Sequence, residues 1–261
     1  MNLQKQDYFN GDLKRAFFSI RFLIGGLGVM FALFYSLHRM SDYPSVYTAY
    51  MSALYFIPFS LTLMFCAVPF AASFLEDIKH KYIQLLIMRG SLKKYTLSKI
   101  AMIYISSVAA MVCGVMLFAA FVRLRAPWVL EDEYLYADIL TTVFWKNGHH
   151  LLFFAIHSFF MGLMAGNLTI LSAYVSLFWQ EELLAVAFPF LAYYLMVYYK
   201  NGLFIDVIWL NIEQIFNVSY NVWNDPLYSL LWPLIVSLVT VVLVGTGIYK
   251  KLRRLYDGER N

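Results

Sequence analysis

Six long apolar runs dominate this sequence and limit the folds open to it. They cover residues 22–37, 52–74, 100–122, 151–179, 183–199 and 229–249. A helix needs about 20 apolar residues to cross the roughly 30 Å hydrocarbon core of a bilayer. Across all 261 residues, 61% are hydrophobic and only 14% charged, which is unusual for a soluble domain. The runs therefore predict an all-α membrane protein, a single domain over 1–261 with six transmembrane helices.

A seventh segment, 203–216, is too polar and too short to cross. It reads LFIDVIWLNIEQIF, with Asp206 and Glu213 among its apolar residues. A carboxylate at the bilayer centre costs about 2.5–3.5 kcal/mol on insertion scales. We therefore expect residues 200–228 to form a re-entrant or interfacial segment before the sixth span.

Lysine and arginine are distributed unequally between the two sides that six spans create. Fifteen lie with the two termini and the 75–99 loop, and five lie on the other side. The positive-inside rule assigns the side with fifteen to the cytoplasm. The sequence thus predicts a multi-pass cell-membrane protein with both termini cytoplasmic.

The N-terminal segment 1–21 has an amphipathic pattern. Leu13, Ala16, Phe17 and Ile20 follow the i, i+3, i+4, i+7 spacing of one helical face. The pattern predicts a helix lying at the cytoplasmic membrane surface. The alternative is a plain extension of the first span.

The loop 75–99 is longer than a connection between antiparallel spans requires, which is about 2–8 residues. Ile78, Tyr82, Leu85, Leu86 and Arg89 share one helical face. Gly90 is placed to end that helix, and Ser91 to cap the next one. The loop therefore predicts a helix, a sharp turn and a second helix on the cytoplasmic side, with a face for lipid headgroups or a protein partner.

This loop resembles the first intracellular loop of ABC-2 class permeases, the membrane subunits of type-2 ABC exporters. The resemblance rests on an acidic pair, an apolar helix, an Arg-Gly-Ser turn, and Tyr and Lys before the third span. These elements are Glu76 and Asp77, YIQLLIM, Arg89-Gly90-Ser91, Tyr95 and Lys99. The resemblance also covers the N-terminal helix, the six spans and the re-entrant segment.

Several expectations follow from the resemblance. It implies that the loop carries the coupling helix, which docks on a separate ABC ATPase. ATPase coupling would then rest on Glu76, Asp77, Tyr82, Leu85, Leu86, Arg89, Gly90 and Ser91. It also implies a second permease subunit, either a copy or a homologue, with membrane lipid around the pair and no nucleic acid as partner.

No nucleotide site is visible in the sequence itself. G-x-x-x-x-G-K-[ST], whose backbone amides and Lys cradle phosphates, does not occur. We expect no cofactor on this chain and ATP with Mg on the partner. An intramembrane enzyme is disfavoured, because Glu181-Glu182 is followed by Val186 where a protease motif needs Arg. A non-transporting sensor or assembly subunit stays an alternative.

The family lines its cavity with the second and fifth spans, which here carry aromatic residues and prolines. The prolines are expected to kink these spans, because each removes a helical hydrogen bond. We therefore expect a pathway lined by Tyr55, Phe56, Phe188, Tyr193 and Tyr194, suited to a hydrophobic or amphipathic peptide, lipid or drug. Substrate identity, homodimer or heterodimer, and export or immunity stay open.

Four smaller features carry weaker expectations. The pair Glu181 and Glu182 is either solvated or bound to basic residues of the 75–99 loop or the ATPase. His157 reads as a satisfied histidine inside the bundle, and Cys66 and Cys113 as buried hydrophobes without a disulfide. Small residues allow close helix packing within the subunit: they are Ser106, Ala110 and Gly114 in the third span, and Gly162 and Gly166 in the fourth.

Overall fold

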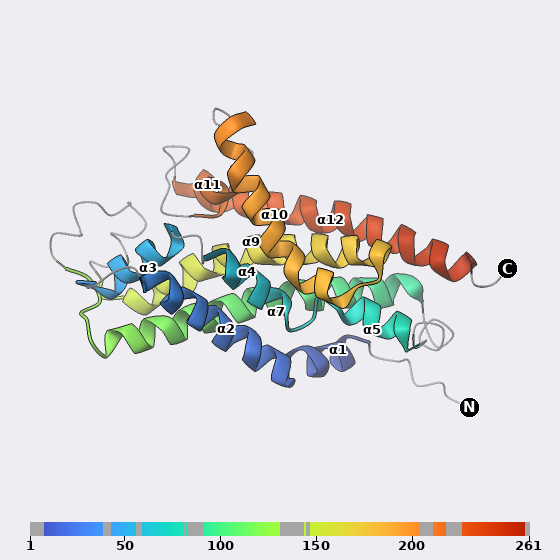
Figure 1. Cartoon of the computed structure of the whole chain (residues 1–261), viewed down its shortest axis with the longest axis horizontal. Helices are drawn as coiled ribbons and strands as arrows, with labels where there is room; N and C mark the ends of the chain where they lie inside the picture. Colours follow the sequence, from blue (N-terminus) through green and yellow to red (C-terminus); the bar gives the residue numbers. More distant parts are fainter. Residues whose placement is uncertain are drawn as a thin grey trace.

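The fold is a bundle of α-helices (Figure 1). A computed structural model describes residues 8–38, 43–55, 59–80, 82, 91–130, 144, 147–203, 211–217 and 226–258. No strand occurs in these ranges. The helices are α1 (Tyr8–Phe17), α2 (Ile20–Leu37), α3 (Val46–Tyr55), α4 (Phe59–Ala67), α5 (Ser73–Lys79), α7 (Leu92–Arg123), α9 (His150–Trp179), α10 (Glu182–Leu203), α11 (Ile212–Phe216) and α12 (Pro226–Gly258).

Four of these helices, α2, α7, α9 and α12, are long and apolar enough to cross a membrane. The pair α3 and α4 would make a fifth crossing if it counts as one span. α10 covers the fifth predicted span, but its apolar part, Glu182–Val197, is shorter than the four. The helices are thus those of a membrane protein with four or five crossings by length and composition, and the sixth stays a prediction.

The second predicted span, 52–74, is interrupted, in line with the kinks expected from its two prolines. α3 and α4 are bent by 84° relative to each other, and residues 68–72 form turns before α5 begins. Pro58 lies in the sequence between α3 and α4, and Pro69 lies in the turns. Proline cannot donate a helical hydrogen bond and clashes with the preceding turn, which explains both interruptions.

Small residues bring the central helices α2, α7 and α9 together. A Cβ atom added at Gly114 of α7 would lie 2.5 Å from the Cβ of Val29 in α2. One added at Gly162 of α9 would lie 3.0 Å from the Cα of Val108 in α7. The contact at Gly114 is shorter than a real Cβ tolerates, and the one at Gly162 is tighter than most real Cβ contacts, so glycine permits this close spacing at both positions. The predicted packing within the subunit is confirmed at these glycines.

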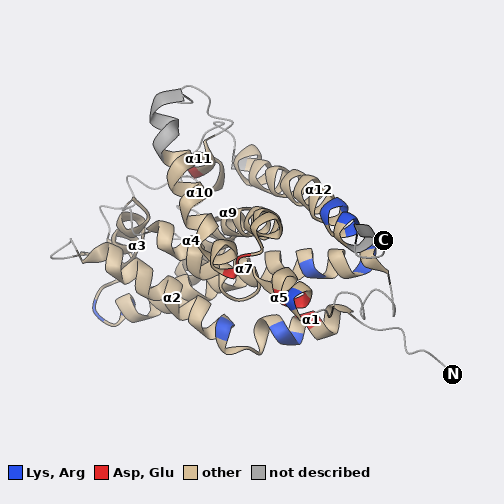
Figure 2. Cartoon of the chain, turned by 45° about the vertical axis from the view of Figure 1, so that its right-hand side comes forward, with Lys and Arg blue, Asp and Glu red and all other residues tan. Residues whose placement is uncertain are grey.

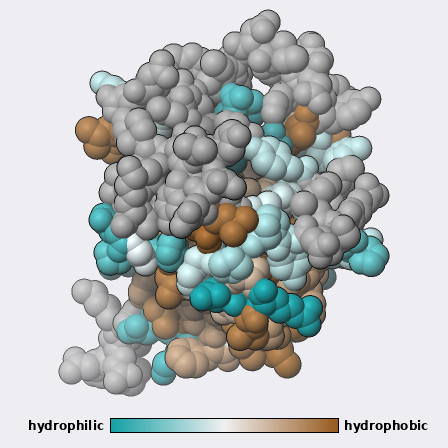
Figure 3. Space-filling view, turned by 90° about the vertical axis from the view of Figure 1, so that its left-hand side faces the viewer, coloured by the Kyte–Doolittle hydropathy of each residue, from teal (hydrophilic) through white to brown (hydrophobic). Residues whose placement is uncertain are grey.

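The bundle has two ends with different chemistry. α1, α5 and the C-terminal part of α12 lie at one end, here called the α5 end (Figure 1). Basic side chains gather there, on α1, the start of α7 and the last turns of α12 (Figure 2). α3 and α11 lie at the opposite end, here called the α3 end. In Figure 3, which faces that end, hydrophilic side chains lie above a hydrophobic flank.

Candidate functional site

The predicted coupling loop begins and ends at the α5 end. α5 ends at Lys79, where the His80 N–H donates to the Glu76 carbonyl. α7 begins at Leu92, and the Ser91 hydroxyl accepts a hydrogen bond of 3.3 Å from the Lys94 N–H. The predicted Ser91 cap is therefore confirmed. These two hydrogen bonds define where α5 ends and where α7 begins, on either side of the segment between them.

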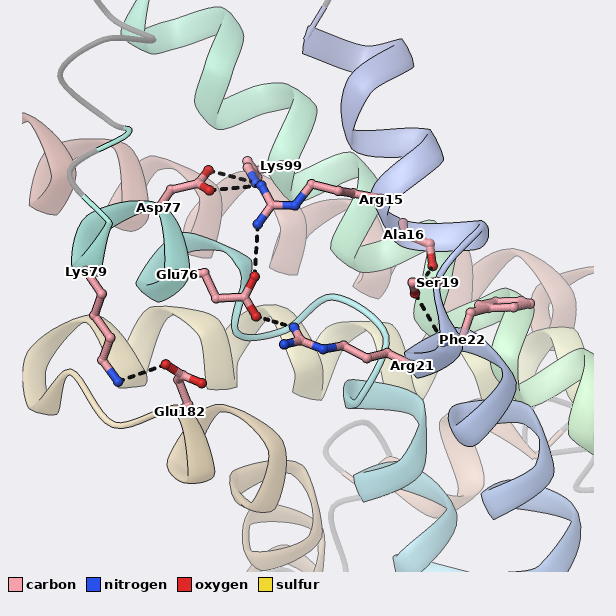
Figure 4. Close-up of polar contacts among 10 residues, drawn as sticks. All are labelled: Arg15, Ala16, Ser19, Arg21, Phe22, Glu76, Asp77, Lys79, Lys99 and Glu182. Carbon is pink, nitrogen blue, oxygen red and sulfur yellow. Dashed lines mark hydrogen bonds and ion pairs between the residues drawn. The ribbon is translucent and has the colours of Figure 1, made fainter.

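Asp77 of α5 is the centre of a buried set of polar contacts (Figure 4). One carboxylate oxygen lies 2.8 Å from the Lys99 ammonium and accepts a 2.9 Å hydrogen bond from the Tyr95 hydroxyl. The other accepts a 2.9 Å hydrogen bond from Arg15 of α1. The side chains of Asp77 and Lys99 are each only 1% exposed. Asp77 therefore joins α1, α5 and α7 through one buried carboxylate.

Lys99 has a second carboxylate partner. Its ammonium lies 3.2 Å from Asp12 of α1, which also accepts a 2.8 Å hydrogen bond from the Ser98 hydroxyl. The ammonium further lies 4.8 Å from the centre of the Phe70 ring, a cation–π distance. A buried ammonium without anions would be very costly, and two carboxylates offset that cost.

Glu76 extends this set of polar contacts from the buried Asp77 to the protein surface. Its carboxylate accepts a 2.9 Å hydrogen bond from Arg15 and pairs with Arg21, near the start of α2. Arg15 and Arg21 are about half exposed, so these pairs lie at the surface. We call the six residues the charge network: Asp12, Arg15, Arg21, Glu76, Asp77 and Lys99.

The cations of the charge network favour the ionised forms of Asp77 and Glu76. Burial alone would raise the pKa of Asp77, but Lys99 and Arg15 keep that pKa below its ordinary value. Burial would also raise the pKa of Glu76, but Arg21 and Arg15 keep it below its ordinary value. The Tyr95 hydroxyl serves as a further donor to the Asp77 carboxylate, at 2.9 Å.

A second, exposed contact ties α5 to the start of α10. Lys79 donates a 2.8 Å hydrogen bond to Glu182, and both side chains are nearly half exposed. The turn before α10 depends on Gln180, which ends α9 with a left-handed φ of 54°. The expectation that Glu182 binds a basic residue of the 75–99 loop is confirmed by this pair.

The predicted ATPase-coupling residues divide into three groups. Asp77 is buried and fully engaged, so it supports the loop from inside instead of contacting a partner. Glu76 and Ser91 also hold the two flanking helices. Tyr82 is 54% exposed. Leu85, Leu86, Arg89 and Gly90 lie outside the described residues.

The sequence reasoning missed Asp12 and Arg15 as members of the site. A usable signal existed for Asp12, because it lies four residues before Ala16 and thus on the apolar face of α1. An acid on such a face predicts a buried cation opposite it. The structure also places α1 differently from a free surface helix, since Asp12 and Ala16 are both buried.

The predicted pathway residues do not share one surface. Tyr193 is 7% exposed, contacts the Phe59 ring edge-on and donates a 2.9 Å hydrogen bond to Glu213. Phe188 is half-buried against the core. Tyr55 and Tyr194 are 69% and 48% exposed on the single chain. Phe56 lies outside the described residues.

Comparisons with other proteins add no identity to this geometry. Protein-family models, curated proteins and solved structures give no match to the chain. Within the described ranges, no three His, Cys, Asp or Glu side chains converge so as to hold a metal ion. Cys66 and Cys113 are free thiols; Cys66 is buried as predicted, but Cys113 is exposed on the single chain, so its predicted burial is wrong. The charge network is therefore the most organised polar site of the part that the structure describes.

Proposed function

We propose that this chain is the membrane-spanning permease subunit of an ATP-driven exporter of the ABC-2 class. In this proposal the α5 end faces the cytoplasm, and the segment between α5 and α7 docks on a separate ABC ATPase. The single observation that carries the proposal is the attachment of both arms of that segment to one buried carboxylate, Asp77. A loop without a mechanical role has no need for such an anchor, because a surface turn would connect the helices at lower cost.

The charge network suits a coupling device in a second respect. Movement of the loop would be passed directly to α1 through Arg15, to α7 through Lys99 and to α10 through Lys79. Three of the elements that would line or flank a pathway are thus joined to the loop by charge-assisted contacts, which are the stronger kind of hydrogen bond. ATP and Mg would be bound by the partner.

The proposed cargo is a hydrophobic or amphipathic peptide, lipid or drug. Tyr55 and Tyr194 are exposed aromatics on α3 and α10, available to line a space between this chain and a second permease subunit. Their rings combine an apolar body with a polar tip, which fits an amphipathic molecule.

The proposal is tested by isolating the tagged chain from its native membrane with its partners. An ABC ATPase should copurify, and its hydrolysis rate should depend on the chain. Tyr82→Ala, an exposed change outside the charge network, should lower that stimulation at least several-fold without changing the melting temperature. Lys94→Ala, an exposed change on the opposite arm, is the matched control.

The second candidate is a non-transporting membrane sensor or assembly subunit. It is favoured by the same observation, since a rigidly anchored cytoplasmic loop also serves as a docking platform. If the chain copurifies with other proteins but no ATPase responds to it, the permease proposal is overturned and the sensor is favoured.

A further inference from the structure

At the α3 end, the five-residue helix α11 is fastened to the bundle by polar contacts at two points. The Tyr193 hydroxyl of α10 donates a 2.9 Å hydrogen bond to Glu213. Asn217, directly after α11, lies 3.0 Å from the Nε2 atom of His157 in α9. Between these points, the Phe216 side chain is 1% exposed. α11 thus lies against two long helices, although it has little length of its own to hold it there.

The His157 ring is itself fixed on its other side. Its Nδ1 atom lies 2.8 Å from the Tyr50 hydroxyl of α3, and the ring is 1% exposed. The Tyr50 and Phe153 rings surround it, with centres 5.2 Å and 5.7 Å away. A carboxamide oxygen only accepts, so Nε2 donates to Asn217 and Nδ1 accepts from Tyr50. His157 therefore connects α3, α9 and the end of α11 in one defined tautomer.

We propose that His157 is a positioning residue that fastens α11 across the α3 end, and that breaking the His157–Asn217 contact releases α11 from the bundle. Its role in transport, as the contact that opens when cargo leaves, rests on the proposed function. The fastening itself does not.

Hydrogen bonds suit a contact that must open and close. When α11 leaves, Asn217 and Glu213 can exchange their protein partners for water, so each bond changes the opening equilibrium by only about tenfold. Apolar side chains, in contrast, cannot replace their lost packing contacts by hydrogen bonds to water. Phe216 supplies the apolar part that returns α11 to its place.

The test measures the exposure of α11 directly, in the purified full chain in lipid nanodiscs. Ile212→Cys serves as the reporter in a background with Cys66→Ala and Cys113→Ala, because Ile212 is partly buried against the core. The rate of its modification by a maleimide is compared among three forms: His157, His157→Gln and His157→Asn.

The glutamine and asparagine variants each retain only one of the two hydrogen bonds that the His157 ring makes. Glutamine places an N–H near the Nε2 position and keeps a donor for Asn217. Asparagine reaches only the Nδ1 position, so it keeps an acceptor for Tyr50 and loses Asn217. We expect His157→Asn and Asn217→Ala to speed modification about tenfold, and His157→Gln to stay within about threefold of the parent.

Two results would overturn the fastening. One is modification of His157→Asn at the parent rate. The other is equal acceleration in His157→Asn and His157→Gln, because a ring that only fills space would not distinguish the two amides. Both faces of a nanodisc are open to the reagent and no ATPase is needed. Suppose that modification is faster in His157→Asn than in His157→Gln, but that no ATPase copurifies with the chain. The proposed function would then be overturned, while the role of His157 in holding α11 would stand.

Discussion

The two ends of this bundle are each held together by buried polar contacts, but the contacts are charged at one end and uncharged at the other. At each end one buried polar side chain joins three elements of the chain. At the α5 end it is the anion Asp77, held by Lys99 and Arg15. At the α3 end it is the imidazole of His157, held between Tyr50 and Asn217 without a charged neighbour among its hydrogen-bond partners.

The difference follows from where each group lies along its helix. Lys99 directly precedes the apolar run 100–122, whereas His157 lies inside the run 151–179. Ionised groups at membrane depth are costly, and those near the end of a span are tolerated when they pair. A hydrogen-bonded neutral ring is cheaper inside a span. Charged contacts thus anchor the α5 end, next to the start of an apolar run, and the uncharged hydrogen bonds of a ring within an apolar run anchor the α3 end.

Removing the buried cation should have the largest effect in this comparison. Lys99→Met keeps the length of the side chain but leaves Asp12 without its cation and Asp77 with only Arg15. Breaking a buried ion pair from one side costs about 3–5 kcal/mol. We expect the melting temperature of the detergent-solubilised chain to fall strongly. Lys94→Met, at an exposed position five residues earlier on the same helix, should change stability by less than about 0.5 kcal/mol.

A parent-like melting temperature for Lys99→Met would show that the α5 end does not depend on its buried charges. The contrast between the two ends would then be lost.

Acid should loosen the α5 end by a smaller amount. The pKa values of Asp77 and Glu76 lie below their ordinary values, so their stabilisation is fully present above about pH 4–5, the range of unperturbed carboxyls. It is lost as the pH falls through the lowered pKa values. Maleimide modification of Leu13→Cys in α1, in the same Cys-free background, should therefore be constant from pH 7 to 5 after correction for thiolate content. It should rise below about pH 4.

Asp77→Asn is the matched control, because it removes one of the two titrating carboxyls while keeping the shape of the side chain. It should raise the modification rate at neutral pH and flatten the acid response. An equally steep acid response in Asp77→Asn would assign the loosening to other groups.

The sequence predicted the helices better than their interruptions. Apolar runs located α2, α7, α9 and α12, because length and hydropathy are properties of a single segment. Pro58 and Pro69 predicted a kink in the run 52–74, but not the 84° angle between α3 and α4 or the turns at 68–72. A proline permits a kink, but whether the chain bends there depends on packing against neighbouring helices, which a single segment does not contain.

The site was predicted only in its local part. The Ser91 cap and the Glu76–Asp77 pair were found because each belongs to a short pattern. The partner Arg15 was not found, since it lies 62 residues from Asp77 in sequence. Tyr95 and Lys99 were named in the same loop pattern, but their contacts with Asp77 were not predicted. Whether an acid contacts a docking partner or a buried lysine depends on tertiary structure. The buried contacts of Asp77 were therefore not predictable from its local pattern, and its role in ATPase coupling stays a prediction.

Substitutions in the exposed ion pair of Lys79 and Glu182 should change the melting temperature least. This pair tests whether a short contact distance alone implies a large contribution to stability. Its 2.8 Å contact is as short as that between Lys99 and Asp77, but both of its side chains are nearly half exposed. Exposed ion pairs are screened over about 10 Å at 0.1 M salt and over about 3 Å at 1 M. Lys79→Glu, which creates three neighbouring acids, should lower the melting temperature slightly at low salt, and Lys79→Glu with Glu182→Lys should restore it. Both differences should vanish at 1 M salt, while the loss in Lys99→Met should persist. A salt-independent effect of Lys79→Glu would mean that this contact, too, is part of the structural anchor of the α5 end.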